Sequence, residues 1–309
     1  MYDAIIVGAG PAGTSAALFG NRLGLKTLLL DKSAFPRDKT CGDALSGKSV
    51  KILDDLDLLE GVNNLDGSII QRIIFANPKH SECELLLDKS LNKQHISHGY
   101  VIPRSIFDNY MFEKAKNVSD AEEGFTVNDL LFEGNRVIGV KGKSVDGSEK
   151  EFRGNLILGA DGPNSIVSKK VGLYQMDMDH TAVGIRCYYE NVKDLTDQIE
   201  LHYVEEINPG YFWIFPSGKN RANIGVGLLK SIVKKESRNL SEIMINIINS
   251  DNFKYRFSDA TLLEKPTGWN PPLGSIKRKN HGEGFLLLGD AAGLVDPFTG
   301  EGIGNAMVS

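Results

Sequence analysis

Apolar residues near the start of the chain form two runs, with a glycine-rich stretch after the first. Ala4–Val7 leads into Gly8–Gly13, and the largely apolar segment Lys26–Leu30 ends at Asp31. Apolar runs that end at turn residues are typical of strands buried on both faces of a parallel sheet. The pattern therefore predicts a strand, a tight turn, a helix and a second strand.

The glycines after the first run have the spacing of a phosphate-binding turn. Gly8 permits the tight turn, Gly10 lets the backbone approach a pyrophosphate, and Gly13 lets the helix pack closely on the strand. Phosphate then lies at the helix N-terminus, where unpaired N–H groups favour negative charge. Asp31 ends the next strand, where a carboxylate can accept both ribose hydroxyls of an adenosine. A turn that only serves the packing of an α/β core is the alternative.

Alternating and buried runs in the middle of the chain predict a small β-meander followed by another buried strand. Phe125–Phe132 and Arg136–Lys141 flank a glycine-asparagine turn, and Lys150–Arg153 supplies a third strand. The apolar run Leu156–Leu158 then leads to Asp161 and a helix. The meander is therefore placed between two halves of a nucleotide-binding fold.

The pattern changes to alternating strands between residues 181 and 229. Such alternation is typical of an antiparallel sheet and indicates a second domain. In one of these strands the two-residue period places Tyr211, Trp213 and Phe215 on one face. These rings either fill the core of the sheet or form the wall of a long apolar cavity.

A second glycine-rich helix start lies near the end of the chain. The run Gly284–Leu288 is followed by Gly289 and Asp290, and the turn Gly300–Gly304 opens a helix. Open α/β sheets bind ligands at the carboxyl ends of their strands, so Asp290 is placed to bind a ribitol or ribose hydroxyl. Two such helix starts, one near each end of the chain, indicate a dinucleotide with two ends to hold and favour FAD over NAD.

Together these patterns predict the α/β (α+β) class, with a Rossmann-like FAD-binding domain, a small β-meander and a second antiparallel-sheet substrate domain. Residues 1–75, 100–175 and 275–309 are assigned to a discontinuous FAD-binding domain. Residues 76–99 and 176–274 are assigned to the substrate-binding domain.

Composition and charge narrow the classes of function. A formal charge of −5, with 24% charged and 41% hydrophobic residues, gives no electrostatic footprint for a nucleic acid. The cysteines are widely spaced and the histidines lack metal-ligand spacing, so neither a disulfide framework nor a metal site is expected. We expect a cytoplasmic protein without a signal peptide or the ~20-residue apolar run of a spanning helix. Peripheral membrane contact through an exposed apolar surface stays open.

The long polar loop after Asp31 and a later helix start carry further candidate site residues. Long loops inside compact domains are usually functional. In this loop Arg37 and Lys39 either meet phosphate or are solvated, and Cys41 is either a site residue or a buried structural thiol. Arg104 opens a helix, where a cation is unfavourable for the helix dipole, so it is either held by an anionic or polar partner or solvated.

Several of these motifs together resemble a known flavoprotein superfamily. Three segments are similar, in order, to the three fingerprints of FAD-dependent hydroxylase-like proteins: Gly8-x-Gly10-x-x-Gly13 with Ala17, Gly24 and Asp31, then Ala160-Asp161-Gly162, then Leu288-Gly289-Asp290. Within that superfamily, Pro36–Gly42, Tyr211–Pro216 and Asn223–Gly227 resemble the geranylgeranyl reductase family. The resemblance covers nearly the whole chain.

The resemblance implies a cofactor, its contacts and a reaction. FAD would be bound by Gly8, Gly10, Ala12, Gly13, Asp31, Lys32, Cys41, Gly42, Arg104, Asp161, Gly289, Asp290, Gly302 and Ile303, with a backbone contact near Val127. Family members reduce isoprenoid carbon–carbon double bonds: reduced FAD gives hydride to one alkene carbon, and a proton reaches the other. Cys41, beside the isoalloxazine ring, and Tyr211 and Trp213, in the cavity wall, are the expected catalytic residues. The implied partners are an isoprenoid lipid and an electron donor, which is NAD(P)H, ferredoxin or another reduced carrier.

The chain departs from the family pattern in two places. Many superfamily members carry a second glycine after Cys-Gly, where this chain has Asp43. The chain also stops at Ser309, inside the helix that Gly302 begins, whereas relatives continue. We therefore expect a C-terminal part to be missing.

Other flavin chemistries are open alternatives. Gly210–Pro216 is also similar to the GWxWxIP stretch of flavin-dependent halogenases, with Tyr211 and Phe215 in place of tryptophan and isoleucine. The FAD fingerprints do not distinguish reduction from monooxygenation of an aromatic substrate. A flavin-binding or carrier module without catalysis is a third interpretation.

Overall fold

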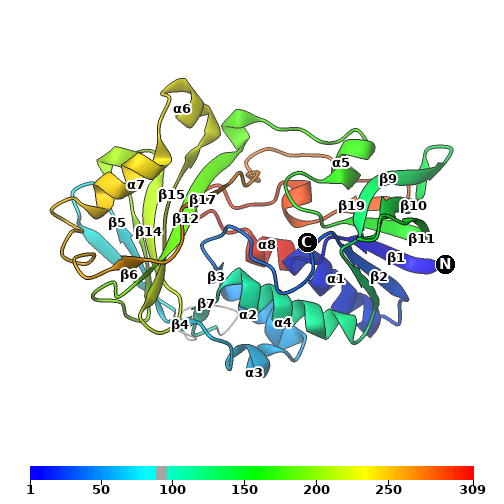
Figure 1. Cartoon of the computed structure of the whole chain (residues 1–309), viewed down its shortest axis with the longest axis horizontal. Helices are drawn as coiled ribbons and strands as arrows, with labels where there is room; N and C mark the ends of the chain where they lie inside the picture. Colours follow the sequence, from blue (N-terminus) through cyan, green and yellow to red (C-terminus); the bar gives the residue numbers. More distant parts are fainter. Residues whose placement is uncertain (88–95) are drawn as a thin grey trace.

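The protein has two parts, and the chain crosses between them several times (Figure 1). This computed structural model describes residues 1–87 and 96–309. One part holds a parallel sheet and the N-terminus, the other holds a large antiparallel sheet, and the last helix lies near the middle of the view. Residues 88–95, which include His95 and part of the segment 76–99 assigned to the substrate domain, lie outside the described residues.

The first part is built on a parallel sheet that buries both faces. Its strands, in spatial order, are β19 (Phe285–Leu287), β11 (Glu149–Gly159), β1 (Tyr2–Val7), β2 (Thr27–Asp31) and β8 (Asp120–Glu123), with the short antiparallel β18 (His281–Gly282) beside β19. Ile6 and Leu29 pack against α1 (Pro11–Arg22) and α4 (Arg104–Lys116), whereas the alternate residue Ile5 faces the opposite side. Because both faces are covered, the strands need uninterrupted apolar runs.

A small β-meander covers the second face of this sheet, as predicted. β9 (Thr126–Glu133) and β10 (Arg136–Lys143) form the hairpin, and β10 pairs with the first half of β11. The sequence predicted separate strands at 150–153 and 156–158, but β11 is one continuous strand. The Gly154–Asn155 pair, which resembles a turn, marks the place where β11 leaves the meander and begins to pair in parallel with β1.

The second part is dominated by a large, mostly antiparallel sheet. Its strands, in spatial order, are β16 (Thr261–Leu262), β12 (Ala182–Glu190), β15 (Arg221–Leu229), β14 (Tyr211–Pro216), β13 (Gln198–His202), β5 (Arg72–Ala76) and β6 (Glu82–Leu86), and β17 (Thr267–Trp269) also pairs with β12. Among these described strands, only β13 and β5 run parallel. The chain joins this sheet at Arg72, so the predicted domain boundary after residue 75 was wrong and cuts through β5.

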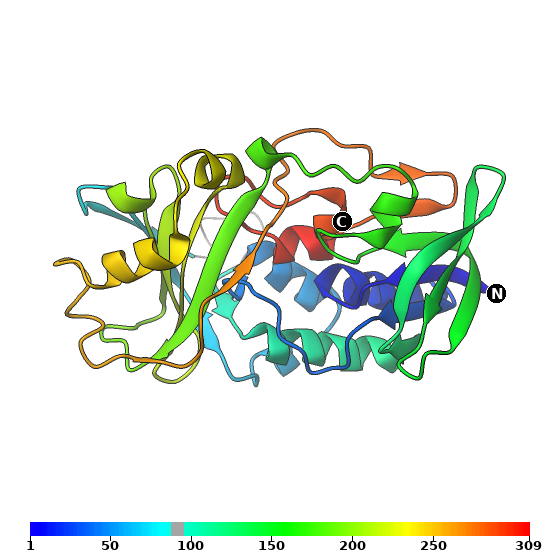
Figure 2. The same cartoon turned by 45° about the horizontal axis from the view of Figure 1, so that its top comes forward.

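Helices cover one face of the large sheet, and the first part of the molecule lies toward the other (Figures 1 and 2). α7 (Leu240–Ile248) packs over Phe212 and Ile214 of β14 in an apolar core. Trp213 and Phe215 project from the opposite face of the same strand and belong to a different cluster. The two faces of β14 therefore contact different parts of the protein.

A small antiparallel sheet and several short helices connect the two parts. This sheet contains, in spatial order, β3 (Ala44–Leu45), β7 (Gly99–Val101) and β4 (Ser68–Ile70). The other described helices are α2 (Gly47–Asp55), α3 (Leu59–Val62), α5 (Ile166–Lys170), α6 (Lys230–Lys235) and α8 (Ile303–Val308), with 3-10 turns at Met178–His180, Glu205–Ile207 and Gly289–Ala292. α8 packs against α1 and α2, so the end of the chain returns to the first part. Within residues 1–87 and 96–309, no helix combines the length and apolar character that crossing a bilayer requires.

Candidate active site

The glycine-rich turn between β1 and α1 forms a cradle that side chains would fill. Gly8 has φ +101°, and a Cβ there would collide with the Ala160 carbonyl. A Cβ on Gly13 would overlap the Gly8 carbonyl oxygen, so α1 packs closely on β1 only because this residue is glycine. Gly10 is less crowded, because the nearest atom to its Cβ position is Arg37 Nη2 at 3.7 Å. The cradle at the start of α1 therefore fits the pyrophosphate of a dinucleotide.

Asp31 ends β2 beside this cradle, as the sequence predicted. The residue is only 8% exposed. The N–H of Ala9 donates to Oδ2 (2.7 Å), and the N–H of Ser33 donates to Oδ1 (2.8 Å). These bonds fix the carboxylate, and each oxygen keeps a second lone pair that can accept a ribose hydroxyl. Lys32, the next residue, is exposed.

Two other predicted cofactor residues have structural roles. Asp161 accepts hydrogen bonds from the N–H groups of Ile166 (2.6 Å) and Val167 (3.3 Å) at the start of α5. Burial raises the pKa of Asp161 although these bonds oppose the shift, and its Oδ1 has no hydrogen-bond partner among the described residues. Val127 is buried in β9 opposite Gly142, so its side chain belongs to the core and the implied FAD contact rests on its backbone.

Arg104 opens α4 and is buried with an acidic partner one turn along the helix. Its Nε donates to Asp108 Oδ1 (2.6 Å) and its Nη2 donates to Asp108 Oδ2 (2.7 Å). Arg37 Nη1 donates to the same Oδ2 (2.7 Å). Burial opposes the charge of Arg104, but Asp108 and Cys41 raise its pKa above the ordinary value. Arg104 and Arg37 are therefore held by an anion inside the protein, and the alternative of a solvated Arg104 is wrong.

The sequence did contain a signal for this ion pair. Asp108 lies four residues after Arg104, and residues at that spacing are neighbours on the surface of a helix. The signal was missed because a polar pair at this spacing is more often exposed, and only packing against the rest of the protein buries it.

Residues from both ends of the chain meet beside the start of α1. A Cβ on Gly289 would lie 3.4 Å from the Cβ of Ala12, so the two segments are in close contact. Asp290 Oδ2 accepts a hydrogen bond from Lys39 Nζ (3.2 Å), and its Oδ1 lies 3.7 Å from the Cβ position of Gly302. Lys39 is therefore paired rather than solvated. The predicted residues that meet here are Ala12, Gly289, Asp290, Gly302 and Ile303.

The loop at Cys41 bridges the two parts of the molecule. Cys41 is half-buried, and its carbonyl accepts a hydrogen bond from Asn223 Nδ2 (2.7 Å) in β15. A Cβ on Gly42 would lie 3.1 Å from the Phe215 ring and 3.8 Å from Trp213 Nε1. The loop that was expected beside the flavin therefore contacts the aromatic strand directly.

Asp43, which departs from the family pattern, is a buried carboxyl at the centre of this contact. It has φ 66°, a left-handed conformation that glycine adopts without strain. Oδ2 accepts hydrogen bonds from the Tyr188 hydroxyl and from Asn223 Nδ2 (2.8 Å), whereas Oδ1 has no partner among the described residues. Burial raises the pKa of Asp43 to about 6, although these two bonds and the charge of Arg186 oppose the shift. Sequence reasoning missed this role, because Tyr188 and Asn223 meet Asp43 only through the tertiary structure.

One face of β14 carries aromatic rings, and glycine in the neighbouring strand makes room for them. The ring centroids of Tyr211 and Trp213 lie 6.0 Å apart, and those of Trp213 and Phe215 lie 6.1 Å apart. A Cβ on Gly225 would overlap the Trp213 indole, so the ring lies across β15 only because this residue is glycine. Trp213 Nε1 donates to Asn223 Oδ1 (2.9 Å). The predicted alternation is confirmed, because the rings belong to a different cluster from the core under α7.

Comparison with known proteins assigns the chain to a family of flavoproteins. A family model described as an FAD binding domain matches residues 1–308. Digeranylgeranylglycerophospholipid reductase 1 of Methanopyrus kandleri is 31% identical, over 99% of this chain and 78% of its own length. The digeranylgeranylglycerophospholipid reductase of Methanosarcina acetivorans is also 31% identical, over 99% of this chain and 72% of its own length.

Solved structures with the same fold include reductase-like proteins and halogenases. A geranylgeranyl bacteriochlorophyll reductase-like protein from Thermoplasma acidophilum has a TM-score of 0.88 at 24% identity, over 99% of this chain and 75% of its own. A flavin-dependent brominase has a TM-score of 0.83 at 24% identity, over 99% of this chain and 76% of its own. These structures show the fold alone, and the sequence matches decide the family. With nearly its whole length matched, the chain belongs to the geranylgeranyl reductase family of FAD-binding flavoproteins and is an FAD-dependent oxidoreductase.

Proposed function

We propose that this protein uses FAD to reduce carbon–carbon double bonds in the geranylgeranyl chains of membrane lipids. The relatives from Methanopyrus kandleri and Methanosarcina acetivorans are named as reductases of such a lipid. The observation that carries the proposal is the close approach of Gly42 to the Phe215 ring. It brings the loop expected beside the isoalloxazine ring against an apolar aromatic face, on which a hydrocarbon chain can lie.

The residues of the first part would hold FAD along the carboxyl edge of its parallel sheet. Gly10 and the start of α1 suit the pyrophosphate, and Asp31 suits the adenosine ribose. Asp290, Gly302 and Ile303, which meet near the same helix, suit the flavin half. When bound and reduced, the flavin supplies the hydride that alkene reduction needs. The protein residues supply binding, orientation and the exclusion of water.

The aromatic face of β14 would orient the prenyl chain beside the flavin. Tyr211, Trp213 and Phe215 form a row of rings that ends near Gly42. Such a row binds an isoprenoid through buried apolar area, which contributes roughly 25 cal/mol per Å². Orientation of this kind lowers the barrier because the reacting atoms are held together. Cys41, at the end of the row, would position the substrate or limit its access to the flavin.

Anaerobic reoxidation of the reduced flavoprotein tests this proposal. The FAD-loaded protein is reduced with dithionite, and a digeranylgeranyl glycerophospholipid is then added without oxygen. We expect the absorbance of oxidised flavin to return, and the lipid to gain a pair of hydrogen atoms for each double bond reduced. The fully saturated diphytanyl lipid is the matched control, and it should leave the flavin reduced.

Further assays on the same protein preparation distinguish the reductase from the other flavin-dependent functions. Flavin that stays reduced with the unsaturated lipid would contradict the proposal. Hydroxylation or halogenation of an aromatic compound in the presence of oxygen would then support the monooxygenase or halogenase interpretation. Bound FAD with no turnover of any substrate would support a flavin carrier.

A reductase of this kind also needs an electron donor and access to its lipid. We expect NAD(P)H, ferredoxin or another reduced carrier to reduce the bound flavin, because each reduced double bond oxidises one flavin. Anaerobic mixing of the oxidised flavoprotein with each donor, followed by flavin bleaching, identifies it. We also expect peripheral contact with membranes, which sedimentation with lipid vesicles measures.

A further inference from the structure

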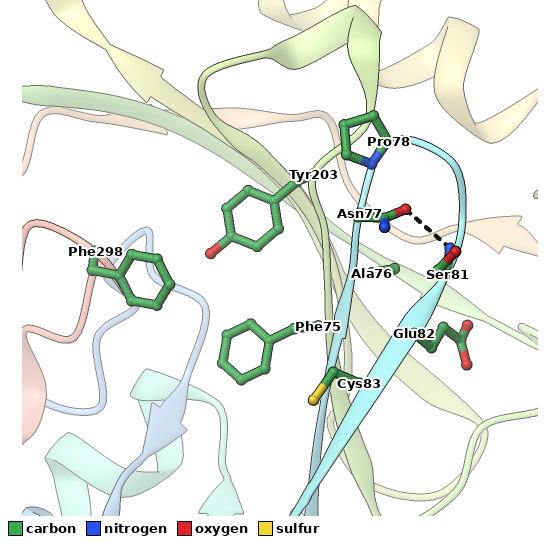
Figure 3. Close-up of a pocket in the computed structure, with 9 residues that line it drawn as sticks. All are labelled: Phe75, Ala76, Asn77, Pro78, Ser81, Glu82, Cys83, Tyr203 and Phe298. Atoms are coloured by element: carbon green, nitrogen blue, oxygen red, sulfur yellow. Dashed lines mark hydrogen bonds between the residues drawn. The ribbon is translucent and has the colours of Figure 1, made fainter.

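An apolar hollow lies where the edge of the large sheet meets the loop that leads to α8 (Figure 3). Its volume is about 590 Å³. Phe75 and Cys83 line it from β5 and β6, Tyr203 lines it from the end of β13, and Phe298 lines it from the loop. None of its described lining residues belongs to the expected FAD site, so the hollow is a separate feature.

The rings that line the hollow adjoin the aromatic face of β14. Cross-strand pairing through β13 places Phe75 and Trp213 on the same face of the sheet. The ring centroids of Phe298 and Tyr203 lie 6.3 Å apart, and those of Tyr203 and Tyr211 lie 5.8 Å apart. The rings that line the hollow are therefore in contact with the aromatic row that leads through Trp213 to the loop at the expected flavin site.

The wall formed by Phe298 is fixed to the aromatic strand. The Tyr211 hydroxyl donates to the Thr299 carbonyl (2.7 Å). Asp296 Oδ1 accepts hydrogen bonds from the N–H groups of Phe298 (3.1 Å) and Thr299 (2.7 Å). These bonds hold Phe298 over the hollow while 65% of the residue stays exposed. A large exposed ring beside an apolar hollow is typical of a binding site for an apolar ligand.

The rim of the hollow also points to an isoprenoid with a polar end. Leu85 of the edge strand is 50% exposed and projects from the same face as Cys83, which extends the apolar surface outward. Behind the rim, the Tyr203 hydroxyl is buried, has no hydrogen-bond partner among the described residues and points into the gap between Phe75 and Phe298 (Figure 3). A ligand with an oxygen at the end of an apolar chain satisfies both features.

We propose that this hollow is the entrance of the prenyl-chain site, where the chain passes between Phe75 and Phe298 and its polar end stays near Tyr203. The inference rests on the proposed reductase function, which requires the prenyl chain to run from the hollow toward the expected flavin site. The described lining contains Glu82 and no cationic residue, so a phosphate group alone does not fit it. The occupant is therefore the isoprenoid chain, and its terminal oxygen lies at the Tyr203 hydroxyl.

Chemical modification of Cys83 measures whether the chain occupies the hollow. Cys83 is exposed and lines the hollow, whereas Cys187 is buried. The oxidised, FAD-loaded protein is treated with limiting N-ethylmaleimide, and peptide mass spectrometry follows each cysteine. With geranylgeraniol at about ten times its dissociation constant, we expect modification of Cys83 to slow about tenfold, because few molecules stay unoccupied. Glycerol 1-phosphate, the headgroup without a chain, should leave the rate unchanged.

The neighbouring residue on β6 supplies a matched control. Glu84 projects from the face opposite Cys83. In the variant Cys83→Ser/Glu84→Cys, geranylgeraniol should not slow modification at position 84. Equal slowing at both positions would indicate a general effect of the amphiphile, and no slowing at Cys83 would show that the chain binds elsewhere. Either result would overturn the proposal.

A second variant reports on binding without a thiol reaction. Phe298→Ala removes a largely exposed ring, so we expect an unchanged melting temperature and unchanged FAD affinity with weaker binding of geranylgeraniol. Unchanged geranylgeraniol affinity would contradict the entrance. Lipid-dependent reoxidation without protection of Cys83 would overturn the entrance and leave the reductase function standing. Protection without reoxidation would support the entrance and contradict the reductase.

Discussion

The part with the parallel sheet and the part with the large sheet assemble their polar groups in different ways. In the part with the parallel sheet, Asp31 is bonded to the N–H of Ala9 at the glycine-rich turn, and Arg104 is paired one helical turn away. In the large sheet, Trp213 and Asn223 belong to neighbouring strands, and Asn223 then reaches Asp43 in the other part. The first kind of site follows from strand ends and helix starts, whereas the second exists only when strands pair and the two parts meet.

The large sheet adds a second contrast, between its own two faces. Phe212 and Ile214 are buried under α7 in a conventional apolar core. Trp213 and Phe215 are almost as buried, but both contact the Cys41 loop, and Trp213 also donates a side-chain hydrogen bond to Asn223. Burial alone therefore does not separate scaffold from site, and the substitutions below are chosen to do so.

Phe212→Ala should give the largest effect, and it should be an effect on stability only. Phe212 is fully buried, and its ring centroid lies 5.1 Å from that of Phe253. Removal of such a ring leaves a cavity and should lower the free energy of unfolding by about 3–5 kcal/mol. Urea unfolding measures this loss, and prenyl affinity per folded molecule should stay the same. Phe132→Ala, at a half-exposed ring, should change stability by no more than about 0.5 kcal/mol.

Asp43→Asn should raise the free energy of unfolding at neutral pH, because it removes a buried carboxyl from the contact between the two parts. The folded-state pKa of Asp43 is raised from 3.8 to about 6, so the folded protein binds this proton more tightly than the unfolded chain. Stability of the FAD-free parent should therefore fall, through this group, by about 3 kcal/mol as pH rises from about 3 to about 7. The asparagine variant lacks the titrating carboxyl, so it should exceed the parent in free energy of unfolding at pH 7.

Urea unfolding of both proteins across that pH range isolates the contribution of Asp43. The difference between them is the relevant quantity, because other carboxyls titrate in the same range. Asp57→Asn, at a side chain that is 90% exposed, should keep the pH dependence of the parent. A constant difference between Asp43→Asn and the parent from about pH 4 to about pH 7 would show that the carboxyl is not destabilised by burial.

Asp31→Ala should weaken the binding of FAD while the parallel sheet keeps its structure. It removes the acceptor for the ribose and also the acceptor for the Ala9 N–H, so the turn loses a brace. We expect a loss of about 1–3 kcal/mol in FAD binding, which is roughly 5- to 150-fold in dissociation constant. Fluorescence titration with FAD measures it, and the melting temperature of the FAD-free protein reports the lost brace separately. Unchanged FAD affinity would refute the role of Asp31.

Trp213→Leu should give the smallest change in ligand binding, and that change should be selective for the lipid; it should also lower stability, because the ring is buried. It shortens the aromatic row and removes the hydrogen bond to Asn223. We expect prenyl affinity to fall by about 1–2 kcal/mol, with FAD affinity unchanged. Ile214→Val, on the opposite face of the same strand, should lower stability by about 1 kcal/mol and leave lipid affinity alone. A lowered melting temperature with unchanged lipid affinity for Trp213→Leu would mean that this face is scaffold as well.

The sequence by itself determined the features that depend on neighbours along the chain. Local backbone geometry accounts for three features that the sequence predicted and the structure has. They are the turn at Gly8 and Gly13, the position of Asp31 at the end of its strand, and the meander hairpin. The common face of Tyr211 and Trp213 follows from the two-residue period of a strand. These features survive in any fold that keeps the local elements, which explains why they could be predicted.

The tertiary structure decided everything that depends on register and on the meeting of the two parts. The continuity of β11 depends on its two sets of partners, and the burial of Arg104 with Asp108 depends on packing over α4. Asp43 meets Tyr188 and Asn223 because β12 and β15 pair in one register, and a shift of one residue would turn these side chains to the other face. No local pattern encodes such contacts, because the residues are far apart along the chain and only the folded sheet brings them together.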